Sequence, residues 1–119
     1  MTNDLKIYHL CVKSQWDKAV VTGEYTMSTR DKTLAEVGFI HCSTANQLQR
    51  TAKKFYGDCV EEMVLVEIDI SALQVAQIEV KFEDGGDGDL FPHIYGALPC
   101  SLVGEIFPAA FNSAGDLVF

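Results

Sequence analysis

The three histidines of the chain carry its most informative chemistry. His41 stands beside Cys42 in the stretch GFIHCS, His9 lies in KIYHL and His93 in LFPHIYG, so aromatic residues flank all three. A lone histidine in a strand is more often a hydrogen-bonded core residue, because backbone groups can satisfy an imidazole. Glycine and proline near these histidines let a ligand approach the backbone. The shared surroundings predict that the three side chains converge on one site.

Metal binding is not expected, although three histidines and four cysteines could supply zinc ligands. None of these residues stands at the spacing of a structural zinc site, and the adjacent residues His41 and Cys42 point to opposite faces of a strand. The DGGDGD stretch at residues 84–89 lacks the aspartate spacing and closing glutamate of an EF-hand. This stretch is predicted to be a solvated loop.

Cysteine chemistry is also weakly supported. A nucleophilic Cys42 would need a base on its own side of the strand, and His41 faces away. The sequence contains no C-x-x-C pair, and small buried hydrophobes are expected at all four positions. These positions are Cys11, Cys42, Cys59 and Cys100.

The elements that would position the histidines begin with a buried strand at residues 5–12. By alternation, His9 shares a face of this strand with Ile7 and Cys11. A short helix capped by Ser14 is expected next, and residues 29–37 could form another helical turn or two.

His41 is predicted to lie in a short strand, 38–43, that leads directly into a strong helix. Thr44 and Gln47 form a capping box, and apolar residues follow at helical spacing up to Gly57. The opposite helix face carries Arg50, Lys53 and Lys54. A phosphate or carboxylate could be held at this helix N-terminus; alternatively, Ser43 or Thr44 satisfies the free N–H groups.

The second half of the chain reads mainly as strands. Residues 62–70 and 75–83 alternate as half-buried strands joined by a short turn around 71–74, with Glu83 at the end of the second. Residues 90–96 are extended after the loop, and a last strand at 101–111 is expected to break at Pro108. Strands outnumber helices without regular interleaving, which favours an α+β fold.

The overall composition limits the classes of partner. A chain of 119 residues fits a single domain spanning 1–119. Residues 1–57 carry eight Lys/Arg against five Asp/Glu, and residues 58–119 carry one against twelve, which disfavours nucleic-acid binding. A signal peptide and an apolar run of about 18 residues are both lacking, so no membrane association and a cytoplasmic location are expected.

Several motifs together resemble the domain of unknown function 952 family of small bacterial proteins. They are IYHL, GFIHCST leading to a helix with QL and a terminal FY, VLVEID, a strand ending in glutamate, and LFPHIYG. The likeness covers nearly the whole chain in order. Members of this family resemble the ADP-ribosyltransferase fold, in which a pair of small sheets surrounds a cleft that holds NAD in the enzymes.

The resemblance implies roles for particular residues. In enzymes with a His-Tyr-Glu set, a first-strand histidine orients a ribose, an aromatic ring stacks on nicotinamide and a glutamate bonds the ribose 2′-hydroxyl. His9 matches the first role, and Glu83 or Glu67 the last. The aromatic role is open to Tyr8, Tyr56 and Tyr95. Fold relatives that remove a 2′-phosphate from RNA depend on several arginines, whereas this chain has only Arg30 and Arg50.

The sequence therefore predicts a histidine-lined cleft that binds a small molecule, of nucleotide or ADP-ribose type, with NAD as a candidate cofactor. His9, His93 and Glu83 are the predicted catalytic residues, with His93 as general acid or base and Glu83 stabilising an oxocarbenium-like centre through a hydroxyl. The predicted ligand-binding residues are His41, Ser43, Thr44 and Tyr95. The alternative is a non-catalytic module that binds a metabolite or a protein on the same fold.

Overall fold

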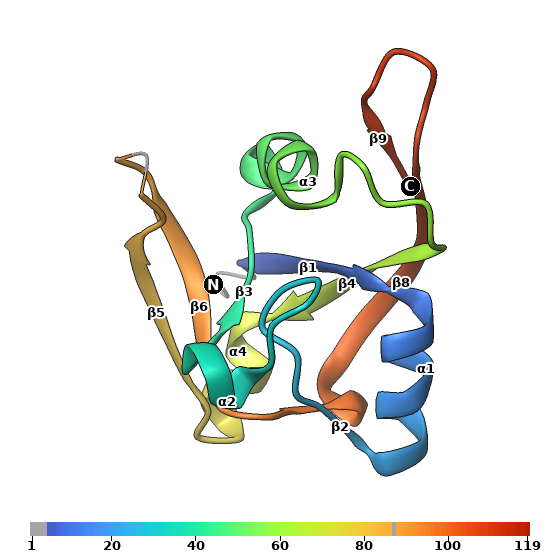
Figure 1. The fold of residues 1–119 in the computed structure, drawn as a ribbon. Coiled ribbons are helices and arrows are strands. Elements are labelled where there is room, and N and C mark those ends of the chain that lie inside the picture. Colours follow the sequence, from blue (N-terminus) through green and yellow to red (C-terminus); the bar gives the residue numbers. More distant parts are fainter. Residues whose placement is uncertain (1–4, 87) are drawn as a thin grey trace.

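A four-stranded antiparallel sheet forms the centre of an α+β fold (Figure 1). The computed structural model describes residues 5–86 and 88–119. The strand order is β1 (Lys6–Val12), β4 (Met63–Asp69), β8 (Val103–Phe111) and β9 (Leu117–Val118). β1 and β4 pair without interruption from Lys6 opposite Asp69 to Val12 opposite Met63. The central position of β4 explains why its sequence is so apolar.

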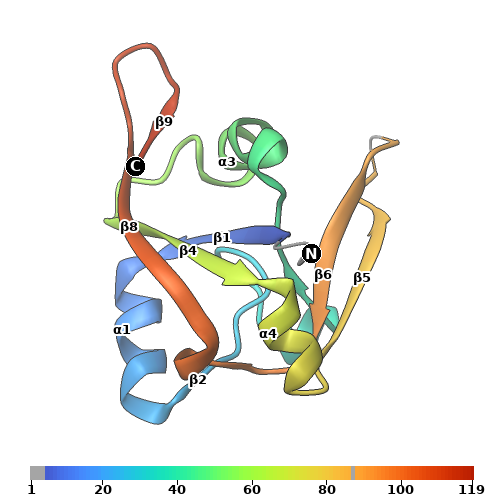
Figure 2. The ribbon, with the colours of Figure 1, turned by 180° about the vertical axis from the view of Figure 1, so that it is seen from behind.

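A smaller antiparallel sheet stands beside the first one. It contains β3 (Ile40–His41), β6 (Leu90–Tyr95) and β5 (Glu79–Asp84), and a separate two-stranded pair joins β2 (Glu24–Tyr25) to β7 (Leu98–Pro99). The β5–β6 hairpin projects along one side of the molecule, as Figures 1 and 2 show from opposite directions. His41 lies directly opposite His93 in the β3–β6 pairing. Sheet pairing therefore brings together two histidines that are far apart in sequence.

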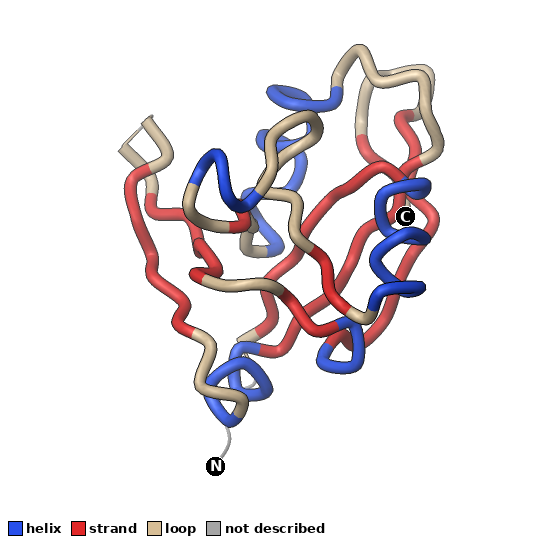
Figure 3. Tube along the Cα trace, turned by 60° about the horizontal axis from the view of Figure 1, so that its bottom comes forward, coloured by secondary structure: helices blue, strands red, loops and turns tan. Residues whose placement is uncertain are grey.

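Short helices surround the sheets (Figure 3). The α-helices are α1 (Lys13–Thr22), α2 (Leu34–Val37), α3 (Leu48–Tyr56) and α4 (Ile70–Val75), and the 3₁₀ turns are Ala45–Gln47 and Cys100–Leu102. Within the described ranges, no helix is both long enough and apolar enough to cross a membrane.

Two apolar clusters lie on opposite faces of the four-stranded sheet. On one face α3 packs against the sheet, with Leu48 and Ala52 contacting the cluster that contains Leu65. On the other face, α1 and the inner side of the smaller sheet enclose the cluster that contains Ile68 and Ile94. Burial of apolar area on both faces is the main stabilising term expected for this fold.

The two sheets are also connected through the backbone. Tyr8 in β1 donates its N–H to the Ser43 carbonyl, and Ser43 donates its N–H to the Tyr8 carbonyl, both at 2.8 Å. Ser43 follows β3 by two residues. The chain therefore crosses from the smaller sheet to the edge of the larger one just after His41.

The expected Thr44–Gln47 capping pair is present at the 3₁₀ turn that leads into α3, whereas the expected cap of α1 is not present. Gln47 Oε1 accepts the Thr44 N–H at 3.0 Å. Ser14 was predicted to cap the first helix, but α1 begins at Lys13 after Val12 and has no side-chain cap. The Lys13 N–H donates instead to the Glu62 carbonyl. Because β1 runs directly into α1, the backbone preceding β4 takes over the capping function.

Two strand predictions in the second half were wrong. The expected turn at 71–74 is the helix α4, and β5 begins only at Glu79. Leu73 is fully buried, and its carbonyl accepts the Ile78 N–H, so burial of one helical side chain overrides the local alternation. The last strand does not break at Pro108, which pairs opposite Val64. β8 meets β9 only at Ala110 and Phe111, and a strand edge tolerates a missing N–H.

The expectation that β4 is half-buried was also wrong, and this has a measurable consequence. Leu65 and Ile68 point to opposite faces and both are fully buried. We therefore predict that Leu65→Ala and Ile68→Ala each lower the free energy of unfolding by about 2–5 kcal/mol in urea denaturation. Val60→Ala, at a 97% exposed position, is the control and should change little. A near-neutral result for either core variant would contradict burial on both faces.

Candidate functional site

His9 is held by hydrogen bonds at both ring nitrogens. Its Nδ1 lies 2.7 Å from the His41 carbonyl oxygen, and its Nε2 lies 2.7 Å from the Tyr25 hydroxyl. A carbonyl only accepts, so Nδ1 donates and Nε2 accepts from Tyr25. Burial raises the pKa of the Tyr25 phenol, which keeps this donor protonated. His9 therefore connects β1 to β3 and β2 and has no ring nitrogen left for a ligand.

A second chain of polar contacts links the other two histidines to the surface. His41 Nδ1 lies 3.3 Å from His93 Nε2, and His93 Nδ1 lies 2.8 Å from Glu83 Oε1. The Tyr95 hydroxyl donates to the same carboxylate oxygen at 2.5 Å. Neighbouring strand positions in the smaller sheet place these side chains on one face. The result is a continuous path from an accessible carboxylate to a half-buried imidazole.

The partners also determine where the protons lie when this chain of histidines is uncharged. The hydrogen bonds from Tyr95 and His93 lower the pKa of Glu83, which favours the carboxylate, an acceptor only. His93 therefore donates from Nδ1 and accepts at Nε2, so His41 must donate from its own Nδ1. His41 Nε2 is left as an acceptor, and this atom is buried without a hydrogen-bond partner. The chain ends in one unused proton acceptor.

Stacked aromatic rings fix the orientation of the histidines. Phe39 stacks on His93 with ring centroids 3.9 Å apart, and this covers a side chain that is already buried. Phe55 and Phe91 each lie with their ring centroids 5.4 Å from that of His41. Gly38, just before Phe39, has φ of 101°, a conformation that favours glycine and turns the chain from α2 into β3. The local backbone therefore places Phe39 over the site.

Burial controls the protonation of two of the histidines. It lowers the pKa of His9 to about 4, because the charged imidazolium would be desolvated. It also lowers the pKa of His41 to about 4, with further contributions from the charges of His93, His9 and Lys54. His41 is therefore uncharged at neutral pH and can act as a hydrogen-bond acceptor or base.

Two small hollows adjoin His41 and share His41, Thr51 and Phe55 as lining residues. The first, which we call the outer hollow, is also lined by Arg50, Lys54, Gly85 and Phe91. The second, the inner cavity, lies between β1, α3 and the turn at 28–29 and has a volume of about 10 Å³. His41 thus lies between an outer hollow lined by two basic side chains and an inner cavity that it lines together with Ser28.

The cations of the outer hollow come from the exposed side of α3. The Arg50 guanidinium bonds Asp89 and lies 5.4 Å from the centre of the Phe91 ring. The Lys54 ammonium lies 5.4 Å from the Phe55 ring centre, and within the described residues it forms no ion pair. The Lys54 ammonium, the Arg50–Asp89 ion pair and two aromatic faces therefore lie beside the His41 ring.

Several predicted site residues have internal partners instead. Ser43 Oγ donates to Thr51 Oγ1 at 2.8 Å, and the Thr44 hydroxyl donates to Asn46. Gln47 Oε1 accepts the Thr44 N–H at the start of the 3₁₀ turn that leads into α3. Ser43 and Thr44 therefore support the turn after His41, and the geometry does not place their hydroxyl groups for ligand contact.

The structure also distinguishes among the tyrosines that could take the aromatic role and the glutamates that could bond a ribose hydroxyl. Tyr8 bonds Glu67 on the other side of β1, and Tyr56 donates to the Leu10 carbonyl in the core. Only Tyr95 and Glu83 among these residues join the histidine chain. Sequence reasoning did not single out Tyr25, Phe39 or Phe91. The charged face of α3 was visible in the sequence and was the one signal that could have identified Arg50 and Lys54.

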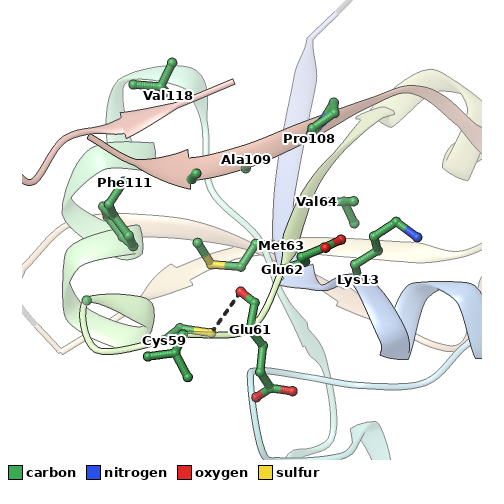
Figure 4. Close-up of a pocket in the computed structure, with 13 residues that line it drawn as sticks. Lys13, Cys59, Glu61, Glu62, Met63, Val64, Pro108, Ala109, Phe111 and Val118 are labelled. Carbon is green, nitrogen blue, oxygen red and sulfur yellow. Dashed lines mark hydrogen bonds between the residues drawn. The ribbon is translucent and has the colours of Figure 1, made fainter. Parts of the chain in front are cut away.

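A larger hollow lies away from the histidines, near the start of β4 and the end of β8 (Figure 4). Its volume is about 750 Å³, and most of its wall is apolar, including Val60, Met63 and Phe111. Cys59 at its edge donates weakly to the Glu61 carbonyl. Size alone does not define a functional site, and this hollow lacks the convergent polar groups found at His41.

Neither metal nor cysteine chemistry gains support from the geometry. Over the described ranges, no group of three histidine, cysteine or acidic side chains is arranged to hold a metal ion. Cys42 faces the apolar cluster on the side of β3 away from His41, and burial raises the pKa of its thiol. Asp84 accepts the N–H groups of Gly86 and Gly88 and thereby structures the loop; Asp87 of this loop lies outside the described residues.

The family of the chain follows from its sequence. The model of the family described as "Protein of unknown function (DUF952)" matches residues 10–106, so the chain belongs to this family. The match includes the stretches around His41 and His93. Among curated proteins, none matches this chain.

Solved structures of a bacterial protein share the fold. The crystal structure of protein CC0527 from Caulobacter crescentus is 28% identical to this chain with a TM-score of 0.79, over 95% of this chain and 93% of that one. The solution NMR structure of CC0527 gives 28% identity and a TM-score of 0.72, over 93% and 90% of the two chains. Both neighbours cover nearly the full length, so the α+β architecture belongs to the chain as a whole.

Stability should fall in mild acid because of the buried histidines. His9 and His41 have folded-state pKa values below the unfolded value of about 6.5, so the unfolded state binds more protons. The contribution of these two uncharged imidazoles to the free energy of unfolding is complete above pH 6.5 and is lost as the pH falls towards 4. We predict that urea denaturation shows a free energy of unfolding that decreases from pH 7 to pH 5, by up to about 1.4 kcal/mol per pH unit for each histidine. Equal stability at pH 7 and pH 5 would contradict the closed environment of these rings.

Two tyrosine variants should separate the buried contact from the exposed one. Tyr25→Phe removes the donor to His9 Nε2 and leaves a buried acceptor unpaired, so it should cost about 1–3 kcal/mol of unfolding free energy. Tyr95→Phe removes a donor to the accessible Glu83 and should cost much less. Thermal and urea denaturation of both variants provide the measurement. The idea fails if Tyr25→Phe is as stable as the wild type.

Proposed function

We propose that the chain binds a small anionic ligand of nucleotide or ADP-ribose type on the surface around the outer hollow, whose own volume of about 20 Å³ accommodates only one small group of the ligand. One observation carries this proposal: His41 Nε2 is a buried acceptor without a partner, held at the end of the His93–Glu83 chain. Buried polar groups are normally satisfied, and an exception requires an explanation such as a catalytic role or a bound molecule. Leaving this nitrogen without any partner would cost stability, so a partner for it is expected.

The anionic character of the ligand rests on Arg50 and Lys54. Both side chains are exposed and line the hollow, while the chain as a whole has a formal charge of −8. Phosphate groups match guanidinium and ammonium donors, and a base or ribose face can pack against Phe55 and Phe91. Two basic side chains on an acidic protein favour a small anion over a nucleic acid, whose long backbone the acidic second half would repel.

A more specific form of this proposal is that the chain has an ADP-ribosyltransferase-like fold and carries out an NAD-dependent reaction. In that reaction the bond between ribose C1 and the nicotinamide nitrogen breaks, nicotinamide leaves with the electron pair, and an acceptor hydroxyl bonds C1. His41 would take the acceptor's proton, because both nitrogens of His93 already have partners. This moves the general-base role from His93 to His41. Glu83 would bond a ribose hydroxyl, and His93 and His9 would position His41.

A non-catalytic module is the second candidate. The enclosed hydrogen bonds of His9 and His93 favour it, because groups fixed on every side suit recognition better than repeated proton transfer. The same outer hollow would then hold a metabolite without turning it over. In both versions we propose a single cytoplasmic domain spanning residues 1–119.

Binding measurements on matched variants of two adjacent lysines test the proposal. ADP-ribose should bind the wild-type protein in isothermal titration calorimetry, and Lys54→Gln should weaken binding about fivefold by removing one cation. Lys53→Gln is the control, since Lys53 pairs with Asp116 and does not line the hollow. His41→Asn should weaken binding further. Absence of ADP-ribose binding, or equal effects of the two lysine variants, would overturn the proposed site.

Incubation with NAD separates the two candidate functions. A catalytic protein releases nicotinamide, and His41→Asn should reduce that release at least a hundredfold because a general base typically contributes about 10²–10⁴-fold. Chromatography of the products provides the measurement. Binding of ADP-ribose without nicotinamide release would favour the non-catalytic module.

A further inference from the structure

Two residues that line the inner cavity each carry a buried polar atom that lacks a hydrogen-bond partner within the described residues. One is His41 Nε2, and the other is Ser28 Oγ. Ser28 is fully buried, and the atoms around it belong to β1, α3 and the turn at 28–29. A buried hydroxyl without a partner costs about 1–3 kcal/mol, so two such atoms lining one small cavity require an explanation.

The backbone of Ser28 is fully engaged, which leaves only its hydroxyl unused. Its N–H donates to the Lys32 carbonyl at 2.8 Å, and its carbonyl accepts the His41 N–H at 3.1 Å. These bonds hold the turn at 28–32 against β3 and bring Ser28 next to His41. The serine side chain contributes nothing to this arrangement, so the turn itself does not account for the hydroxyl.

The two unpaired atoms have complementary hydrogen-bonding character. The tautomer of His41 makes its Nε2 an acceptor, whereas the Ser28 hydroxyl can donate. A group that bonds both must accept from Ser28 and donate to His41 at once. A carbonyl or phosphate oxygen only accepts, and an ammonium only donates. A hydroxyl group or a water molecule does both.

The size of the cavity restricts the group further. A volume of about 10 Å³ is close to the lower limit for one water molecule. A hydroxyl oxygen fits this space, while a methoxy or carboxylate group does not. The inner cavity also shares His41, Thr51 and Phe55 with the outer hollow, so the two lie next to each other.

We propose that the inner cavity is a hydroxyl-binding subsite formed by Ser28 and His41. It holds one water molecule in the free protein, and a ligand hydroxyl replaces that water while the anionic group of the ligand lies at Arg50 and Lys54. This inference rests on the proposed function for the ligand, and it narrows the ligand class to phosphorylated sugars or polyols. It assigns Ser28, which has no other role in the site, to ligand selection.

A high-resolution crystal structure of the free protein tests the subsite without any ligand. The expected result is one ordered oxygen within hydrogen-bond distance of both Ser28 Oγ and His41 Nε2, and its loss in Ser28→Ala. Ser43→Ala is the matched control, because Ser43 also lines the cavity but already donates to Thr51. An empty cavity in the wild-type protein, or an oxygen that remains unchanged in Ser28→Ala, overturns the proposal.

Binding of ribose 5-phosphate and its 2-deoxy and 3-deoxy analogues tests the ligand hydroxyl. One analogue should bind about tenfold more weakly than ribose 5-phosphate to the wild type, and Ser28→Ala should remove most of that difference. Equal binding of all three overturns the hydroxyl subsite while the proposed anion site stands. If none of them binds, the claim for a ligand hydroxyl falls with the proposed function, and the bridging oxygen alone supports a structural water site.

Discussion

The pair of hydrogen bonds made by the His9 ring holds the two halves of the site together. One bond fixes the carbonyl of His41 in the smaller sheet, and the other fixes the hydroxyl of Tyr25 in the β2–β7 pair. His9 itself belongs to the edge of the larger sheet. Because the ring is fully buried and uncharged, these bonds are strong and their loss is costly. This anchor fixes the backbone of His41, from which its ring extends towards His93, Phe55 and Phe91.

Much of the fold could be predicted from local sequence patterns. Alternation identified β1 and β4, helical spacing with the Thr44–Gln47 pair identified α3, and the excess of strands indicated an α+β fold. The patterns failed where tertiary contacts decide the outcome. Burial of Leu73 makes α4 a helix, and pairing on both sides makes β4 apolar on both faces. No short stretch of sequence reports such contacts.

The three histidines of the site could be identified from the sequence, but their roles could not. Aromatic and glycine neighbours predicted convergence of the histidines, and strand pairing does place His41 opposite His93. Roles depend on which ring nitrogens remain free, and this follows from partners distant in sequence. Tyr25 bonds Nε2 of His9, and Glu83 and His41 bond the two ring nitrogens of His93. Of the three rings, only that of His41 keeps a nitrogen without a partner. Ser28 lies in a stretch without a recognisable motif, so only its burial reveals it.

The central claim is that one hydrogen-bonded arrangement of three histidines leaves a single acceptor at His41 Nε2. Long-range ¹H–¹⁵N NMR spectra of the imidazole rings near pH 7.5 test this most directly, with assignments from His9→Gln, His41→Asn and His93→Gln variants. The account predicts a proton on Nδ1 in all three rings and an unprotonated Nε2 on His41, which stays unprotonated down to about pH 5. A protonated Nε2 on His41, or a His41 ring that titrates near pH 6.5 as in an unstructured peptide, would contradict it.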